Sequence, residues 1–277
     1  MRNKNNLKII IIAIIVVAVL IAGGLVVGNS ELFEDETTTE PVTLATTRIT
    51  FIEGSTLTEC FKLLEENGVA SYESLMNVAQ NSDFSNYKIY SDIPDDENRC
   101  FKLEGYLFPD TYDFFLDEAP ESVISRFLSN TDVKITDEMR QRATELGYTM
   151  DEIIIIASII QAEGAFPDDA STIAGIIYNR LEDGIKLQMD STYFYVEDDI
   201  ASYVGEENMD SYKEIYDTYT CYSLPRGPVC NPGMFAINAA LYPEETDYYY
   251  FCHDNAGNTY YATNYSDHLA NCRKAGL

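Results

Sequence analysis

Glu163 is the single carboxylate in an apolar run, "IIIIASIIQAEGAF", that extends from residue 153 to residue 166. A carboxyl group among aliphatic side chains loses hydration when it ionises, so its pKa rises. An acid that keeps its proton near neutral pH can protonate a leaving oxygen, as cleavage of a glycosidic bond requires. The alternative is a solvated glutamate at a helix end. The negative end of the helix dipole disfavours a carboxylate there, which favours a functional reason for it.

Gln188 and Asp190 form a second candidate pair, within "KLQMDSTYFY". Residues two apart point the same way in an extended segment. An amide and a carboxylate presented together could hydrogen-bond the hydroxyls of a sugar. The alternative is a polar turn that precedes a strand.

Tyr178, Asn179 and the arginine that follows them place an aromatic ring, an amide and a guanidinium at one helix end. Sugar sites use these types, although a cation at a helix C-terminus is also favourable by itself. The loop "SLPRGPVCNPG" contains Asn231 together with three prolines and two glycines. Such a rigid loop could line a cleft or could simply connect two elements.

Other chemistries have little support. His253 and His268 are far apart in the sequence, and no CxxC pair occurs, so we assign no metal ligands. Phosphate-loop, dinucleotide-binding and GxSxG motifs are also absent from the sequence. We therefore predict neither a metal nor an organic cofactor.

The charge of the chain excludes one class of partner. The sequence has 46 acidic against 18 Lys and Arg residues, a net charge of −28. Phosphate binding needs a basic patch, and none is visible, so we predict no nucleic-acid partner. A solvated surface is the simplest interpretation of the acidity.

The N-terminus predicts a membrane anchor. Residues 9–30 carry no charge, and three basic residues precede them. This length can cross a bilayer core as one helix, with a cytoplasmic N-terminus and the remainder outside. A cleaved signal peptide is the alternative, although its apolar core is normally shorter. We assign residues 1–28 to the cytoplasmic tip and anchor, and residues 29–47, rich in Thr and Glu, to a flexible linker.

The six cysteines all follow the predicted anchor, and an even number in an exported region suggests disulfides. Six cysteines allow 15 connectivities. The simplest choice joins neighbours in sequence: Cys60 with Cys100, Cys221 with Cys230, and Cys252 with Cys272.

Residues 48–97 predict a small unit of strand, two helices and a further strand, an order typical of LysM-like carbohydrate-binding modules. The polar stretch "DIPDDEN" marks its end. Residues 98–277 predict a mixed α+β domain. The helix that carries the apolar run begins at a capping box, Thr149 with Glu152. A hairpin of "DYYYFCHD" with "TYYATN" and a short C-terminal helix follow late in the chain. The overall fold class is α+β.

These stretches, in their order along the chain, resemble the MltG (YceG-like) endolytic murein transglycosylases. The resemblance covers residue 48 to the C-terminus and is carried by "LEGYLFPDTYDF", "ASIIQAEG", "IAGIIYNRLEDGIKLQMDST", "YDTY", "LPRGPVCNPG", "AINAALYPEETDYYYF" and a late "DH".

The chain departs from the family pattern at three positions. Gln161 stands where the family helix commonly has a first acid, which leaves Glu163 as the carboxylate that matches the catalytic one. Ser191 and Arg226 each replace a frequent proline.

The resemblance implies cleavage between N-acetylmuramic acid and N-acetylglucosamine in peptidoglycan strands, leaving a 1,6-anhydromuramoyl end. Glu163 would act as general acid and then base, while Gln188, Asp190, Tyr178, Asn179 and Asn231 would bind substrate. The resemblance also implies partners in the cell-wall synthesis machinery. Two alternatives stay open: an inactive peptidoglycan-binding or scaffold protein of the cell envelope, and a hydrolase that uses Glu163 with Asp190.

Overall fold

The computed structural model describes residues 45–164 and 166–277. The predicted anchor, residues 1–28, and nearly all of the predicted linker lie outside these residues. Within the described ranges no helix combines the length and the apolar character needed to cross a membrane.

A two-stranded sheet joins the start of the described chain to a segment far along the sequence. Strand β1 (Thr46–Thr50) pairs antiparallel with β2 (Thr111–Phe115), and Ile49 lies opposite Tyr112. Alternate residues of β2, Tyr112 and Phe114, are buried, as the period of a strand predicts. The second strand of this unit therefore lies beyond residue 97, where we placed the boundary.

Helices α2 (Leu57–Glu66) and α3 (Tyr72–Asn81) lie between the two strands, followed by the short α4 (Lys88–Asp92). Thr56 caps α2 in a capping box with Glu59, and Ser71 caps α3. These hydroxyls accept hydrogen bonds from N–H groups that the first helical turn leaves free. The predicted order of strand, helix and helix is therefore present.

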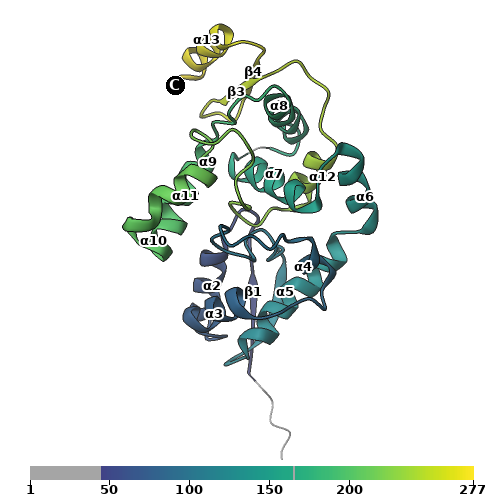
Figure 1. The fold of residues 1–277 in the computed structure, drawn as a ribbon, viewed down its shortest axis with the longest axis vertical. Helices are drawn as coiled ribbons and strands as arrows, with labels where there is room; N and C mark the ends of the chain where they lie inside the picture. The colour runs from purple at the N-terminus through teal and green to yellow at the C-terminus, as the bar shows by residue number, and fades with distance from the viewer. Residues whose placement is uncertain (1–44, 165) are drawn as a thin grey trace, which may run out of the picture. The chain divides into compact units, whose positions relative to one another are not determined.

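Three further helices follow β2: α5 (Pro120–Lys134), α6 (Asp137–Leu146) and α7 (Met150–Ala162). The capping box of Thr149 and Glu152 starts α7, as predicted. Every residue from Ile153 to Ile160 is buried, so α7 is apolar on all sides. It packs against α6, α8 (Ala170–Glu182) and α12 (Met234–Leu241), and Figure 1 shows it among these helices.

The region after Gly184 is more helical than the sequence suggested. It forms α9 (Asp190–Tyr195), a π-helical turn η1 (Val196–Ile200), α10 (Ala201–Val204), a 3₁₀ turn η2 (Glu206–Asn208) and α11 (Met209–Tyr216). The expected strand after the "KLQMD" turn is therefore wrong. Its many tyrosines favour strands locally, but Tyr195 and Tyr216 are buried as members of helices that pack on one another.

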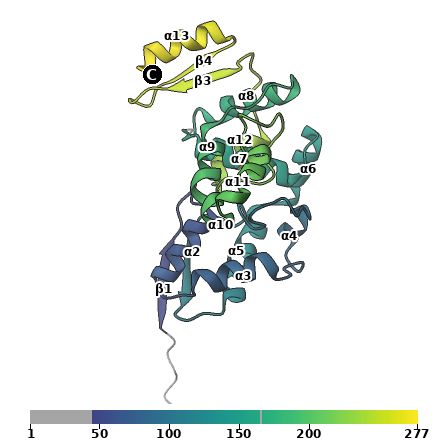
Figure 2. The same cartoon turned by 60° about the vertical axis from the view of Figure 1, so that its left-hand side comes forward.

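The C-terminal region forms the predicted hairpin and helix. Strands β3 (Tyr250–His253) and β4 (Thr259–Ala262) pair antiparallel, and α13 (Tyr265–Ala275) packs on both. Figure 2 shows α13 lying along the hairpin.

The cysteines do not form the predicted local disulfides, because all six thiols are free in the structure. Cys230 contacts the carbonyl oxygen of Ser158, and Cys221 contacts that of Ser223. Of the three predicted pairs, Cys252 and Cys272 do lie close together, with their sulfur atoms within 4.8 Å of each other.

Candidate active site

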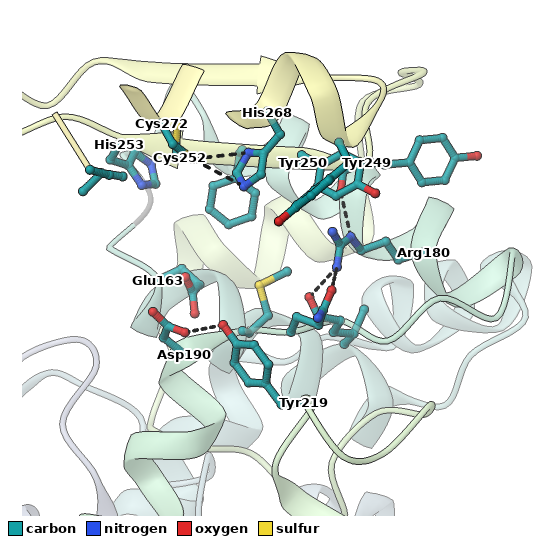
Figure 3. Close-up of a pocket in the computed structure, with 16 residues that line it drawn as sticks. Glu163, Arg180, Asp190, Tyr219, Tyr249, Tyr250, Cys252, His253, His268 and Cys272 are labelled. Atoms are coloured by element: carbon teal, nitrogen blue, oxygen red, sulfur yellow. Dashed lines mark hydrogen bonds between the residues drawn. The ribbon is translucent and has the colours of Figure 1, made fainter. Parts of the chain in front are cut away.

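A pocket of about 530 Å³ opens between the end of α7, the segment that leads into α9, and the C-terminal hairpin. Glu163, Gln188 and Asp190 are among its lining residues. Figure 3 shows the two carboxylates on one side of the pocket and the side chains of the hairpin and α13 on the other. The structure thus brings together three residues that the sequence singled out.

Glu163 is the residue at which α7 ends, and its side chain is half-buried. The backbone N–H of Ser191 donates a hydrogen bond to its Oε1 at 3.2 Å. Burial raises the pKa of the Glu163 carboxyl, the Ser191 hydrogen bonding opposes this shift, and the negative charge of Asp190 adds to it. The isoleucines of α7 face the core, so they fix the helix end rather than surround the carboxyl themselves.

Asp190 accepts a hydrogen bond from the Tyr219 hydroxyl at 2.5 Å. Burial, and then this bond to a carboxylate, raise the pKa of Tyr219 to about 12, so the phenol keeps its proton. Asp190 begins α9 rather than an extended segment, so its position beside Gln188 results from a turn.

Gln188 has a backbone φ of +52°, a conformation that is uncommon for residues other than glycine. Its N–H donates to the carbonyl of Thr218 at 3.2 Å, which helps to hold this turn against the chain that carries Tyr219. Non-glycine residues in this region often mark binding sites, where the surrounding structure imposes the geometry.

Arg180 lines the pocket and connects its two sides, a role that the sequence did not reveal. Its Nε donates to the carbonyl of Tyr249 at 2.6 Å, at the start of the hairpin segment. Its Nη1 donates to the carbonyls of Lys186 and Leu187 at 2.8 and 2.9 Å. The guanidinium also lies over the Tyr250 ring, 4.8 Å from its centroid. One buried side chain therefore positions both walls.

Tyr178 and Asn179 do not line this pocket. The Tyr178 hydroxyl donates to the carbonyl of Ala240 at 2.8 Å, and the Asn179 amide donates to the carbonyls of Thr246 and Tyr248 at 2.7 and 3.0 Å. Tyr178 therefore ties α8 to α12, and Asn179 ties α8 to the chain that leads from α12 into the hairpin.

Asn231 is 1% exposed and also lies away from the pocket. Its Oδ1 accepts from the Leu107 N–H at 2.8 Å, and its Nδ2 donates to the Ser55 carbonyl at 2.9 Å. The proline-rich loop runs along α7 instead of lining the cleft. Its Gly233 N–H donates to the Gln161 Oε1 at 3.1 Å, so the Gln161 amide holds the loop against the end of α7.

Glu104 is a second buried glutamate, 1% exposed, next to Asn231. Its carboxyl accepts from the Leu57 N–H at 2.9 Å and from the Tyr195 hydroxyl at 3.0 Å. Burial raises its pKa to about 8. We did not single out Glu104 from the sequence, because "KLEGY" has no apolar run around its acid.

A second pocket, of about 440 Å³, also borders Glu163. Phe166 and the tip of the hairpin, Asp254–Gly257, line it. Glu163 and His253 belong to both pockets. The carboxyl therefore lies where two hollows meet.

The hairpin and α13 supply side chains that the sequence did not suggest as a group. Tyr250, Cys252, His268 and Cys272 all line the pocket opposite the two carboxylates. The His268 ring stacks on Tyr250, with centroids 5.2 Å apart, and burial lowers its pKa. The tyrosine-rich run "DYYYF" was the available signal, because aromatic faces are common in sugar sites.

A half-buried carboxylic acid beside aromatic and amide groups is the arrangement expected of a protein that acts on glycans. Comparison with known proteins agrees with this class. Residues 29–274 match the YceG-like family, and the chain belongs to that family.

The relatives include two curated proteins named endolytic murein transglycosylase. The protein of Streptococcus pneumoniae (strain D39) is 32% identical over 184 residues, which is 64% of this chain and 33% of that protein. The protein of Bacillus subtilis is 28% identical over 229 residues, 80% of this chain and 63% of that protein. The chain thus spans between one third and two thirds of the length of these relatives.

A crystal structure of a YceG-like protein from Listeria monocytogenes has the same fold. The TM-score is 0.70 at 27% identity, and the match covers 80% of this chain and 75% of that chain.

Proposed function

We propose that this protein is an endolytic lytic transglycosylase of peptidoglycan, with Glu163 as its catalytic acid and base. The observation that carries the proposal is the position of the Glu163 carboxyl, whose pKa burial raises and which remains open to a pocket large enough for sugar rings. The names of the relatives from Streptococcus pneumoniae and Bacillus subtilis support the same reaction class.

The proposed reaction has two proton transfers. Protonated Glu163 gives its proton to the oxygen between N-acetylmuramic acid and N-acetylglucosamine, and the bond from that oxygen to C1 breaks. The Glu163 carboxylate then takes the proton from the C6 hydroxyl of the N-acetylmuramic acid, while the oxygen of that hydroxyl bonds to C1 of the same sugar. The product carries a 1,6-anhydro ring, and the carboxyl is again protonated. No water molecule attacks C1, so the reaction needs no second carboxylate to activate water.

The two pockets that meet at Glu163 support cleavage within a strand. An enzyme that cuts internally must hold sugars on both sides of the broken bond. The 530 Å³ pocket with Gln188 and Asp190 would hold one side, and the 440 Å³ pocket with Phe166 would hold the other. Tyr250 and Phe166 offer aromatic surface to the sugar rings.

The proposal includes a membrane anchor in residues 1–28 with the remaining chain outside the cell membrane. The uncharged stretch from residue 9 to residue 30, with basic residues ahead of it, supports this arrangement. Protease treatment of intact protoplasts would degrade the C-terminal region if it is external. Protection of that region would contradict the orientation.

Mass spectrometry of peptidoglycan digests tests the reaction. We expect products that end in 1,6-anhydromuramic acid from the wild-type chain and none from Glu163→Gln. Products heavier by one water would instead indicate a hydrolase that uses Glu163 with Asp190. No products from the wild-type chain, with retained binding to peptidoglycan, would indicate the binding or scaffold function.

A further inference from the structure

Three metal-binding side chains meet on the wall of the pocket opposite Glu163. One donor atom from each of Cys252, His268 and Cys272 lies within 4.8 Å of the others. Over the described residues this is the single group of three His, Cys, Asp or Glu side chains with such spacing. Figure 3 shows the two sulfur atoms beside the His268 ring.

The elements that carry these residues explain how they meet. His268 and Cys272 are four residues apart on α13, so they lie on the same helix face. Cys252 is two residues from Tyr250 on β3, so both side chains leave the same face of the strand. Tyr250 stacks on the His268 ring, with an angle of 25° between the ring planes. That face of the hairpin is therefore the one that α13 covers.

The spacing of the donors fits a tetrahedral metal. Cys272 Sγ and His268 Nε2 are 3.6 Å apart. A Zn²⁺ ion bonds sulfur at about 2.3 Å and imidazole nitrogen at about 2.0 Å, which sets neighbouring donors about 3.5 Å apart. Thiolate and imidazole are also the ligands that zinc prefers over magnesium or calcium.

We propose that Cys252, His268 and Cys272 bind one Zn²⁺ ion that joins β3 to α13. The two thiols release their protons to solvent as they bind, and the imidazole binds as the neutral ring. The three side chains line the pocket, so a water molecule can complete the coordination from that side. The ion fixes α13 on the hairpin and thereby stabilises one wall of the groove. The site does not depend on the reaction proposed for Glu163.

Zinc titration of the full-length chain tests this site. The protein is purified in detergent with a phosphine reductant, freed of metal by chelation, and titrated against a chromophoric chelator. We expect one equivalent of Zn²⁺ with a Kd tighter than about 1 µM and a higher melting temperature when zinc is bound. Co²⁺ in its place should give a thiolate-to-cobalt charge-transfer band, a readout that needs no enzymatic activity.

Substitutions of the three proposed ligands test which side chains bind the zinc ion. Cys252→Ser and Cys272→Ser should each weaken zinc binding at least about 100-fold. His268→Cys should retain binding and strengthen the cobalt band, a result that a merely structural histidine would not give. Cys221→Ser is the matched control, because this thiol contacts the Ser223 carbonyl away from the cluster, and it should bind zinc as the wild type does.

Three results would overturn the proposal. The reduced wild-type chain could fail to take up one equivalent of zinc. Uptake could persist unchanged in both cysteine variants, which would identify it as adventitious. Chain isolated from cells under alkylating conditions could contain a disulfide between Cys252 and Cys272, which would replace the metal site with a covalent bond.

Discussion

Glu104 and Glu163 are two glutamates whose pKa values are both raised by burial, yet their surroundings differ in one decisive respect. Glu104 lies in the core and accepts hydrogen bonds from Leu57 and Tyr195, which belong to separate elements. Glu163 accepts one backbone hydrogen bond, from Ser191, and otherwise faces a pocket.

The comparison shows that a raised pKa does not identify a catalytic acid. Glu104 has the larger shift, but it lines neither of the two pockets that border Glu163. A proton donor needs both a retained proton and a path to the substrate. Glu163 has a raised pKa and borders a pocket, whereas Glu104 has the raised pKa without the pocket.

The largest expected effect separates the two glutamates by activity. Glu163→Gln should lower the release of anhydromuropeptides by about 10³-fold, because an amide is too weak an acid to protonate the leaving oxygen. Stability should change by no more than about 0.5 kcal/mol, because the amide oxygen can still accept the Ser191 N–H. Product yield by mass spectrometry and urea unfolding measure the two effects. Activity above a tenth of the wild-type value would refute the assigned role.

Glu104→Ala should act on stability, in contrast to Glu163→Gln, which should act on activity. It leaves the Leu57 N–H and the Tyr195 hydroxyl without their partner and opens a cavity, so unfolding should become easier by about 3–4 kcal/mol. Glu104→Gln, which keeps the shape and one acceptor, is the control and should cost less. Urea denaturation at fixed pH measures both. Equal stability of the Ala variant and the wild type would mean that the hydrogen bonds to Glu104 contribute nothing to the free energy of unfolding.

The pH dependence of stability sharpens the contrast. Burial raises the pKa of Glu104 to about 8 in the folded chain, whereas in the unfolded chain the carboxyl ionises near its ordinary pKa of 4.5. Its contribution is therefore complete below that value and is lost as the pH rises towards 8, with a slope of up to about 1.4 kcal/mol per pH unit. Urea unfolding from pH 4 to 8 should show this slope in the wild type and lose it in Glu104→Gln. An identical slope in both chains would assign it to other groups.

The smallest expected effect concerns Asp190. Activity that needs protonated Glu163 should fall as the pH rises through the Glu163 pKa, which the charge of Asp190 helps to raise. Asp190→Asn should therefore move the alkaline limb of the pH–rate profile to lower pH, by less than about one unit, with activity at the optimum reduced less than about tenfold. The product should remain anhydro. A loss of about 10³-fold at every pH would instead make Asp190 a direct participant in the chemistry.

Local signals in the sequence predicted most of the elements but did not predict the site. The capping box of Thr149 and Glu152 and the apolar run after it correctly predicted α7, because caps and periodicity act within a few residues. The hairpin and α13 were predicted for the same reason. Helix α9 was missed, because its aromatic residues favour a strand until packing against α11 is considered.

The site depends on contacts between distant segments, which composition and spacing do not encode. Gln188 and Asp190 reach Glu163 through a turn that the Thr218 and Tyr219 region holds. Asn231 looked suited to bind sugar, yet its amide joins the proline-rich loop to Ser55 and Leu107. The order of motifs along the chain pointed to the family before any of these contacts was known.

Arg180 sets the separation between the two walls of the 530 Å³ pocket from a buried position. Its guanidinium reaches carbonyls on two sides, and a lysine, with all its donors on one atom, could not span both. A change in α8 that tilts this side chain would alter the separation of the walls before it altered Glu163 or Asp190. The width of the pocket can therefore change through a buried cation while the carboxylates stay the same.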